Sequence, residues 1–325
     1  MARRSAIGAV ALALALALAV ACTACTAGSA GSAGGSPPGP ASAGKAGPGV
    51  ITVGSFDFPE SVLLAHLYAG ALSARGYPVR VLPDLGSREL VEPALMTGLV
   101  QLVPEYTGSA LEFVSLGRIH ATADVAATAA ALASAMAARG IVTARPAAAQ
   151  DANAIVVTGA TAFRYRLRTI SDLARAAPGL VFGGPPECPE RPDCLPGLRR
   201  TYGLRFRAFA PLDAGGPLTR QALRAGDIGA ALLFTTDPAI RAEHLVELAD
   251  NRDLQPAENV IPVLRRATAD RYGPGLLAAL DAVSVRLSTD ALAALDAQVE
   301  LDGRDPRTVA RNWLREQGIL RAGVS

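Results

Sequence analysis

Short apolar runs alternate with longer amphipathic segments from Val50 onward. Apolar runs bounded by turn residues predict buried strands, and apolar positions three or four apart predict helices packed on a sheet. The first half of the pattern predicts strands at 50–53, 79–82, 99–103, 141–143 and 155–158, helices starting at Pro59 or Ser61 and at Ser87, and a third helix over 123–138. Glycine, a frequent helix stop, follows each of these helices at Gly76, Gly98 and Gly140.

The second half of the chain repeats this alternation. It predicts strands at 180–182, 206–209, 228–234 and 260–264, helices that start at Ser171 and cover 198–202 and 218–224, and a helical end over 267–317 with caps at Ser288 and Asp305. Repeated β-α-β units favour parallel sheets covered by helices. We therefore expect an α/β protein with two lobes, each built on a mixed, mostly parallel sheet flanked by helices. Lobe 1 is predicted to comprise 50–154 plus 259–325, and lobe 2 to comprise 155–258.

The first 49 residues have a different character. Arg3 and Arg4 precede an unbroken apolar run over 7–21, which is typical of a secretory signal segment. Because Cys22 stands at the cleavage position, we expect a lipoprotein anchored to the outer face of the cytoplasmic membrane. A plain secretory signal, an uncleaved anchor helix, or acylation at Cys25 are the alternatives. The rest of 22–49 is rich in Ala, Gly, Ser and Pro, which predicts a flexible tether.

Cys188 and Cys194 lie in a proline-rich loop of the second half. An exported protein meets an oxidising environment, so we expect a disulfide, with two free thiols as the alternative. Glu187 and Arg191 in the same loop are candidates for the mouth of a ligand cleft. No metal site is predicted, because the histidines are scattered at His66, His120 and His244.

Composition narrows the possible partners. The chain has 325 residues, of which 50% are hydrophobic and 18% charged, enough for two domains with substantial cores. A net charge of +2 without a basic cluster argues against nucleic-acid binding. The motifs of nucleophile elbows and glycine-rich phosphate loops are missing from the sequence, so we predict no catalytic residues and no cofactor. Nothing in the pattern indicates an oligomer, and a monomer is expected.

The segment after the strand at 99–103 carries the most informative chemistry. Ligands of open α/β sheets bind at the carboxyl ends of strands, and 104–108 is predicted to be a turn at such an end. We expect the ring of Tyr106 to contact a ligand, with half-buried packing as the alternative. Thr107 and Ser109 are candidates to donate hydrogen bonds to a ligand carboxylate, to cap a helix, or to do both.

Further candidates follow the first strand. Ser55, Phe56 and Phe58 lie in the next turn, where either ring could face a ligand or hold the start of the following helix. Arg88 is a candidate for a ligand carboxylate, although it could instead pair with Glu92 one helical turn away.

Lobe 2 offers an equivalent set. Phe234, Thr235 and Thr236 follow its most apolar strand and are ligand candidates, and the Asp-Pro pair after them is typical of a helix start. Asn153, next to the predicted lobe crossover, is the remaining candidate, with a turn-capping role as the alternative.

Several motifs occur in order over about 50–317: VGSFDFPES, LGSREL, PEYTGS, DANAIVVT, TISDLA, GAALLFTTDP and ENVIPVLR. Through them the chain resembles the substrate-binding lipoproteins of ABC importers for glycine betaine, choline, carnitine, proline and related quaternary-amine osmolytes. The resemblance implies a bilobal type II periplasmic-binding-protein fold that closes over a solute and delivers it to a membrane permease. It also places Tyr106 at the tyrosine of the family's PEYTG motif.

A trimethylammonium group has no N–H to donate, so aromatic faces hold it, at about 1–2 kcal/mol for a well-placed ring. A ligand carboxylate needs hydroxyls, backbone N–H groups, a helix N-terminus or an arginine. The best-known family members use several tyrosines, whereas this chain has Phe234 in lobe 2 and no aromatic residue at 152–154, which leaves the osmolyte open. The alternatives are a binding protein for an amino acid or polyamine, which would need an acidic cleft residue, or a secreted enzyme or sensor module.

Overall fold

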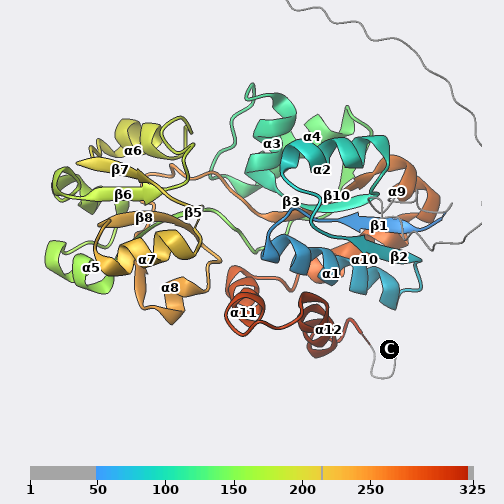
Figure 1. Ribbon diagram of the computed structural model, residues 1–325. Coiled ribbons are helices and arrows are strands. Elements are labelled where there is room, and N and C mark those ends of the chain that lie inside the picture. Colours follow the sequence, from blue (N-terminus) through green and yellow to red (C-terminus); the bar gives the residue numbers. More distant parts are fainter. Residues whose placement is uncertain (1–48, 214, 321–325) are drawn as a thin grey trace, which may run out of the picture. The chain divides into compact units, whose positions relative to one another are not determined.

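The computed structural model describes residues 49–213 and 215–320 (Figure 1). The predicted signal segment, the tether up to residue 48 and the acylation site Cys22 lie outside the described residues. Across the described part of the chain, none of the helices has both the length and the apolar character that a bilayer crossing needs.

The first sheet has five strands in the order β2-β1-β3-β10-β4. These strands are β1 (Ile51–Gly54), β2 (Val79–Leu82), β3 (Leu102–Tyr106), β4 (Ile141–Thr143) and β10 (Val260–Arg265). β1 pairs in parallel with β2 and β3, whereas β10 runs antiparallel to both β3 and β4. The late strand β10 therefore returns to the first lobe, as predicted.

The second sheet has five strands in the order β7-β6-β8-β5-β9. These are β5 (Asn153–Thr158), β6 (Val181–Gly184), β7 (Ala208–Pro211), β8 (Ala230–Phe234) and β9 (Leu245–Glu247). β6 pairs in parallel with β7 and β8, and β5 runs antiparallel to β8 and β9. Both sheets are mixed, as predicted, but antiparallel pairings equal parallel ones because β10 and β5 each run against two neighbours. The numerical limits of the lobes remain a prediction.

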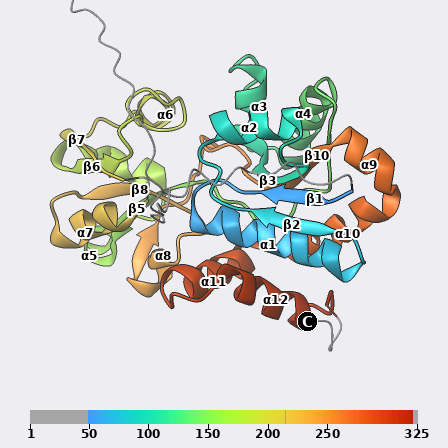
Figure 2. The same cartoon turned by 45° about the vertical axis from the view of Figure 1, so that its right-hand side comes forward.

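Six helices of the first lobe flank its sheet: α1 (Pro59–Ala74), α2 (Arg88–Thr97), α3 (Thr107–Ser115), α4 (Val125–Ala137), α9 (Arg266–Tyr272) and α10 (Pro274–Ser284). Two more, α11 (Thr289–Glu300) and α12 (Pro306–Glu316), pack on α1. The C-terminal helix α12 packs against α1, as Figure 2 shows. Apolar residues of α1 such as Leu63 and Leu67 are fully buried in the hydrophobic core of the first lobe. This packing holds α1 against β1, β2 and β3.

The second lobe is covered by α5 (Gly159–Tyr165), α6 (Leu195–Tyr202), α7 (Pro217–Ala225) and the short α8 (Ala239–Ala242), together with 3₁₀ turns at Ile170–Arg175 and Ala177–Gly179. The predicted helix start at Ser171 is one of these 3₁₀ turns, and Thr169 with Asp172 forms its capping box. Two smaller hydrophobic clusters lie on this sheet, with Phe182 at the centre of one of them.

The predicted turn at 104–108 is wrong in its first half. β3 starts later than predicted and continues to Tyr106, and α3 begins directly at Thr107. The two prolines Pro104 and Pro262 lie opposite each other in the antiparallel β3–β10 pair. Opposite residues of such a pair alternate between hydrogen-bonded and non-bonded positions, so two prolines without N–H groups fit a non-bonded position and leave the strand intact. A proline that appears to break the strand in sequence is thus accommodated by its partner.

Helix caps were predicted unevenly. Ser288 and Asp305 accept backbone N–H bonds at the starts of α11 and α12, as predicted. Ser87 precedes α2 as predicted, but its hydroxyl donates to the carboxylate of Glu89 and makes no cap bond to the backbone. The helix α5 and the strand β9 had no clear sequence signal. For α3 the signal was a possible cap at Thr107 or Ser109, but neither side chain caps the helix, whose N-cap residue is Tyr106.

The predicted disulfide is confirmed between Cys188 and Cys194, both fully buried, which close a short loop before α6. Replacing both cysteines with serine should lower the free energy of unfolding by about 2 kcal/mol, because the bridge limits the entropy of the unfolded chain. Urea unfolding followed by circular dichroism measures this change. The unaltered protein under reducing conditions is the control and should match the variant; equal stability of the variant and the oxidised protein would contradict the expectation.

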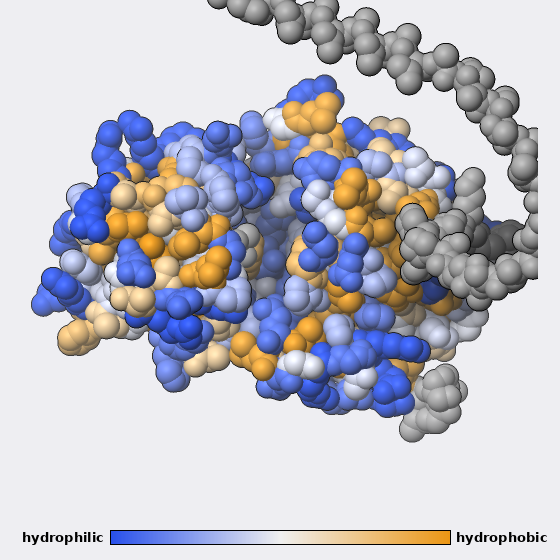
Figure 3. Space-filling view, in the orientation of Figure 1, coloured by the Kyte–Doolittle hydropathy of each residue, from blue (hydrophilic) through white to orange (hydrophobic). Residues whose placement is uncertain are grey.

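Hydrophilic and hydrophobic residues are interspersed over the face shown in Figure 3. Single apolar side chains such as Phe163 and Leu116 are exposed on the surface of the protein, which is ordinary for a folded protein. The surface pattern therefore does not locate the site, and the buried polar groups are more informative.

Candidate ligand-binding site

The aromatic side chains predicted in the first lobe come together in one cluster. The rings of Phe56 and Phe58 stack with centroids 5.7 Å apart, and Phe58 stacks on Tyr106 at 6.2 Å. Phe56 and Tyr106 are buried, whereas Phe58 is 37% exposed. The rings come from the loop after β1 and the end of β3, two parallel neighbours whose carboxyl ends share one edge of the sheet. This aromatic cluster offers ring faces to a cationic ligand at the edge where ligands of such folds bind.

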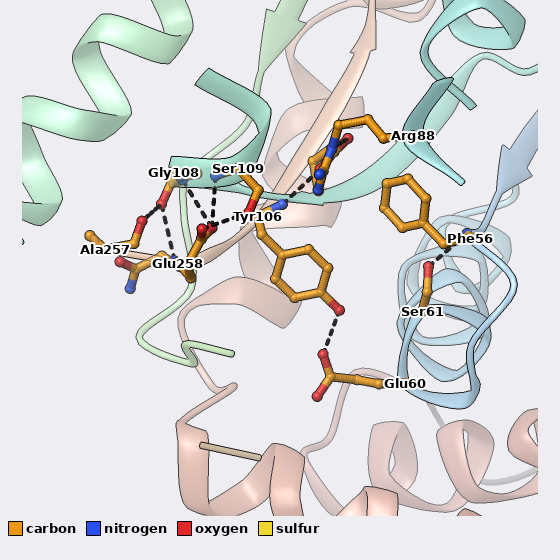
Figure 4. Close-up of polar contacts among 12 residues, drawn as sticks. Phe56, Glu60, Ser61, Arg88, Tyr106, Gly108, Ser109, Ala257 and Glu258 are labelled. Carbon is orange, nitrogen blue, oxygen red and sulfur yellow. Dashed lines mark hydrogen bonds and ion pairs between the residues drawn. The ribbon is translucent and has the colours of Figure 1, made fainter. Parts of the chain in front are cut away.

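Tyr106 is held in place by its hydroxyl. It donates a 2.5 Å hydrogen bond to Oε1 of Glu60, in the first turn of α1 (Figure 4). The loop before α1 is fixed in turn, since the Ser61 hydroxyl accepts the backbone N–H of Phe56. Burial, followed by the nearby Glu60, holds the pKa of Tyr106 well above its usual value, so the phenol stays protonated and remains a donor. The ring is therefore rigid rather than free to rotate toward solvent.

The N-terminus of α3 is occupied by a side chain of the protein itself. The Glu258 carboxylate accepts the backbone N–H groups of Gly108 and Ser109 at 3.1 and 3.0 Å and the Ser109 hydroxyl at 2.6 Å. Gly108 permits this approach, since a Cβ there would lie 3.0 Å from Oε1 of Glu258. Thr107 is also engaged, donating to the Ala257 carbonyl at 2.7 Å. The hydroxyls predicted for a ligand carboxylate thus have internal partners.

Arg88 pairs with a residue other than the predicted alternative. Its guanidinium forms a bidentate ion pair with Glu105 of β3, with N–O distances of 3.0 Å, and lies 5.2 Å from the centre of the Phe56 ring. Glu92, the partner considered from helix spacing, is buried with Oε2 lacking a hydrogen-bond partner. Burial and the negative charge of Glu105 raise the pKa of Glu92 to about 8, which keeps most of this carboxyl protonated at neutral pH. Arg88 pairs with Glu105 of β3 rather than with Glu92, because the fully buried Glu105 carboxylate needs a cation.

A group of carboxyls surrounds the Tyr106 hydroxyl; we call Glu60, Asp151 and Asp296 the acidic cluster, of which Glu60 and Asp296 are buried and Asp151 is half-buried. They come from α1, the crossover before β5 and α11, and Thr236, after β8, donates to Oδ1 of Asp151 at 2.7 Å. Burial raises the pKa of all three carboxyls, and their mutual repulsion adds to the effect for Asp151 and Asp296. The cluster therefore contains more buried acid than its neighbours neutralise.

The other predicted residues of the strand ends have mainly internal contacts. The Ser55 hydroxyl donates to the Phe56 carbonyl and accepts from the Asp84 amide. The Asn153 amide donates to Asp193 of the disulfide loop and to Gln255. Thr235 joins the crossover, accepting from Ala152 N–H and donating to the carbonyl of residue 150. Of the lobe 2 candidates, Thr236 bonds a member of the acidic cluster, Asp151.

Phe234 ends β8, opposite Asn153 in the β5–β8 pair. Its ring lies against Gly215, where a Cβ would come within 3.1 Å of it, and it packs beside the hydrophobic core of the second lobe. Glu187 and Arg191 form an exposed ion pair at 3.0 Å within the disulfide loop. Nothing in these contacts points either residue of the pair at the aromatic cluster.

Cavities adjoin the crossover. One of about 310 Å³ is lined by residues that include Ala152, Thr235 and Ala293; Ala152 directly follows Asp151 in the chain. A larger one, of about 530 Å³, lies at α6 and is lined by Arg199, Arg200 and other residues with no aromatic ring. Neither of these two cavities is lined by a residue of the aromatic or acidic cluster. We favour the strand ends beside the crossover for a small solute, because their position and polar groups decide a site better than volume does. Within residues 49–213 and 215–320, no group of His, Cys, Asp and Glu is arranged to hold a metal ion.

Sequence reasoning missed the carboxylates. Glu60 and Glu258 lie inside the motifs VGSFDFPES and ENVIPVLR, and Asp151 begins DANAIVVT, so their positions in the motifs were the available signal. Asp296 gave no signal, because an acidic residue in an amphipathic helix ordinarily faces water. Only the packing of α11 beside α1 turns it inward.

Comparison with known proteins agrees with this architecture. The family described as the substrate-binding domain of ABC-type glycine betaine transport systems matches residues 49–316. A glycine-betaine-binding protein of Pseudomonas aeruginosa is 31% identical over 293 residues, covering 87% of this chain and 92% of the relative. The glycine betaine-binding protein YehZ of Escherichia coli K12 is 26% identical over 277 residues, covering 82% of this chain and 90% of its own length.

Solved structures show the same fold. The crystal structure of a glycine betaine/carnitine/choline ABC transporter protein superposes with a TM-score of 0.74 at 22% identity, covering 83% of this chain and 99% of that one. Apo YehZ gives a TM-score of 0.68 at 25% identity, with coverage of 83% and 99%. These neighbours confirm the predicted type II periplasmic-binding-protein fold, with two mixed sheets in two lobes. The extent of the family match, together with the first relative, settles the affiliation: the chain belongs to the family of substrate-binding domains of ABC-type glycine betaine transport systems.

Proposed function

We propose that this protein captures a small quaternary-amine osmolyte, such as glycine betaine or choline, outside the cytoplasm and delivers it to an ABC permease. Members of its family are extracytoplasmic proteins that bind small ligands and work with permeases. The protein acts by closing its two lobes over the solute and does not change the solute chemically.

The observation that supports this proposal best is the aromatic cluster of Phe56, Phe58 and Tyr106. Its rings lie where the carboxyl ends of β1 and β3 meet, and Phe58 is accessible to solvent. Aromatic faces attract a trimethylammonium group, which has no hydrogen to donate. In the proposed closed state Thr236 and Phe234 face the same solute from lobe 2.

We extend the proposal to the placement of the protein. Lipidation at Cys22 would hold it at the outer face of the cytoplasmic membrane, with 22–49 as the tether, and lobe limits at 154/155 and 258/259 would place the hinge in the two crossovers. Mass spectrometry of the protein extracted from membranes tests the anchor: a diacylated N-terminus at Cys22 supports it, and an unmodified N-terminus there contradicts it. Sedimentation of the purified protein tests the proposed monomer.

Tyr106→Ala should weaken binding of a quaternary amine at least about tenfold, or about 1.4 kcal/mol, because it removes the most rigidly held ring of the cluster. Isothermal titration calorimetry with glycine betaine, choline, carnitine and proline measures the effect. Phe58→Ala should also weaken binding of the same ligand. Because Phe58 is partly exposed, this variant keeps the core intact.

The control is Tyr165→Ala, which removes a tyrosine from the surface of lobe 2, where it is 38% exposed. It should bind like the unaltered protein. Tyr106→Phe separates the ring from the hydroxyl, since it keeps the ring and loses only the bond to Glu60. Affinity for every quaternary amine unchanged in both Tyr106→Ala and Phe58→Ala would refute the proposed cluster.

A further inference from the structure

Positions that commonly hold a ligand carboxylate are filled by carboxylates of the protein. At α3 the Glu258 carboxylate takes both the backbone N–H groups of Gly108 and Ser109 and the Ser109 hydroxyl. A helix N-terminus favours one anion, and a second carboxylate would have to displace a nearly fully buried glutamate. The end of β3 is therefore a poor place for an anionic group.

The same holds in the second lobe. At the start of α7, which follows β7, the carboxylate of Asp213 accepts the backbone N–H groups of Leu218 and Thr219 at 2.9 and 2.8 Å. The arginines near the strand ends are also neutralised, because Arg88 pairs with Glu105 and Arg220 pairs with Asp237. A ligand carboxylate would find these cations already paired.

The acidic cluster presents the opposite situation. Glu60 is 5% and Asp296 1% exposed, yet no donor among the described residues reaches Oε2 of Glu60 or either carboxyl oxygen of Asp296. The two carboxyls bond each other through one shared proton, which satisfies one oxygen of each and leaves the second oxygen of Asp296 without a donor. Buried polar atoms in folded proteins are nearly always bonded, so orphan oxygens on an inward-facing aspartate need an explanation.

A cation that carries a donor satisfies this cluster. Positive charge offsets the repulsion among the three carboxyls of the cluster, and an O–H or N–H group supplies the hydrogen bond that the unpaired oxygen lacks. Tyr106 joins the two clusters, because its hydroxyl bonds Glu60 and its ring stacks on Phe58. A zwitterion with a carboxylate has no donor to offer and adds a further negative charge.

We propose that the solute of this protein is a net-positive amine that carries an O–H or N–H donor and no carboxylate, with a quaternary amino alcohol as the simplest example. This inference rests on the proposed function, since it assigns a class of ligand to the same aromatic cluster. The acidic cluster then bonds the ligand's donor, and the aromatic cluster holds the ammonium group.

Choline and glycine betaine form a matched pair for the test, because they share the trimethylammonium group and differ in a hydroxymethyl against a carboxylate. Calorimetry of the purified protein at pH 8 should give choline an affinity at least about tenfold higher than that of glycine betaine. Glycine betaine bound as tightly as choline, or more tightly, would overturn the inference while leaving the proposed function intact. If neither compound binds, the inference fails; if carnitine does not bind either, the proposed function fails as well.

Two variants locate the effect. Asp296→Asn should weaken the binding of choline at least about tenfold and change the affinity for glycine betaine much less, because it removes one negative charge from the acidic cluster. Glu258→Gln removes a negative charge at the N-terminus of α3. It should reduce the ratio of the choline affinity to the glycine betaine affinity about threefold or more. Asp302→Asn is the control, since Asp302 is exposed beyond the end of α11, and it should leave both affinities unchanged.

Fold and binding are separated by the thermal unfolding of each variant without ligand. If Asp296→Asn proves unstable, Thr236→Val serves in its place, since it removes the hydroxyl that bonds Asp151 within the same cluster. A preference for choline that persists unchanged in Asp296→Asn or Thr236→Val and in Glu258→Gln would overturn the assignment of the preference to these residues.

Discussion

Replacing Arg88 with alanine should lower the free energy of unfolding by about 3–5 kcal/mol, because it leaves a buried carboxylate without its cation. The Glu105 side chain is 0% exposed and that of Arg88 is 22% exposed, and their bidentate pair joins α2 to β3. Glu105 also accepts the backbone N–H of Tyr106, so the loss would loosen the strand end that bears the aromatic ring. Urea unfolding monitored by circular dichroism measures the change.

The matched control is Arg191→Ala, which breaks an ion pair whose side chains are 60% and 46% exposed. Solvent screens that pair, and the expected loss is about 0–1 kcal/mol. Adding Glu105→Gln to Arg88→Ala should recover part of the lost stability, because it removes the uncompensated charge. An Arg88→Ala variant no less stable than Arg191→Ala would show that Glu105 does not depend on this arginine.

The protein should become more stable as the pH falls from about 8 to about 5, in contrast to proteins whose carboxylates are held charged. Burial raises the pKa of Glu258 from 4.5 to about 7, an effect that the bonds from Ser109 only partly offset. Glu92 shifts in the same direction, to about 8. These two carboxyls therefore bind protons more tightly in the folded protein than in the unfolded chain.

The sign follows from linkage. Between pH 4.5 and about 7 the folded state holds the Glu258 proton and the unfolded state releases it, so the free energy of unfolding falls as the pH rises through this range. A shift of one unit corresponds to about 1.4 kcal/mol, so Glu258 alone accounts for about 3 kcal/mol. Above pH 7 its contribution is constant, while that of Glu92 continues to fall to about pH 8.

Urea unfolding at intervals between pH 5 and pH 8 measures this dependence. Glu258→Gln cannot titrate and should flatten the curve by about 3 kcal/mol over that interval. Glu316→Gln, at the exposed end of α12, is the control and should leave the slope unchanged. Stability that rises toward pH 8 would contradict the burial of these carboxyls as the dominant effect. Ligand must be absent, since a bound cation would stabilise the charged acidic cluster.

The sequence predicted the elements with the clearest local signals. The strands at 79–82 and 141–143 were placed correctly, because each is a short β-branched run between turn residues. Gly98 ends α2 in a left-handed conformation, as its place after the last apolar turn suggested. The return of β10 to the first sheet followed from the order of strands and helices.

Elements whose form depends on distant partners were placed less well. β3 was predicted three residues early because Pro104 looks like a strand end, and only its partner Pro262 shows that the missing N–H is harmless. The helix α3 starts without a side-chain cap of its own and is completed by Glu258, about 150 residues later in the chain. No local pattern carries that information.

The sequence by itself determined the alternation of strands and helices, the pair of cysteines that form the bridge, and the aromatic residues in the loop after β1 and at the end of β3. These follow from short-range periodicity and turn chemistry, which a chain expresses locally. Tertiary structure alone decided which charged groups lie together. It pairs Arg88 with Glu105, places Glu258 at the N-terminus of α3, and brings Glu60, Asp151 and Asp296 into one cluster. The energy of a charge depends on its solvent exposure and its nearest partners, and both are set only when segments far apart in the chain pack.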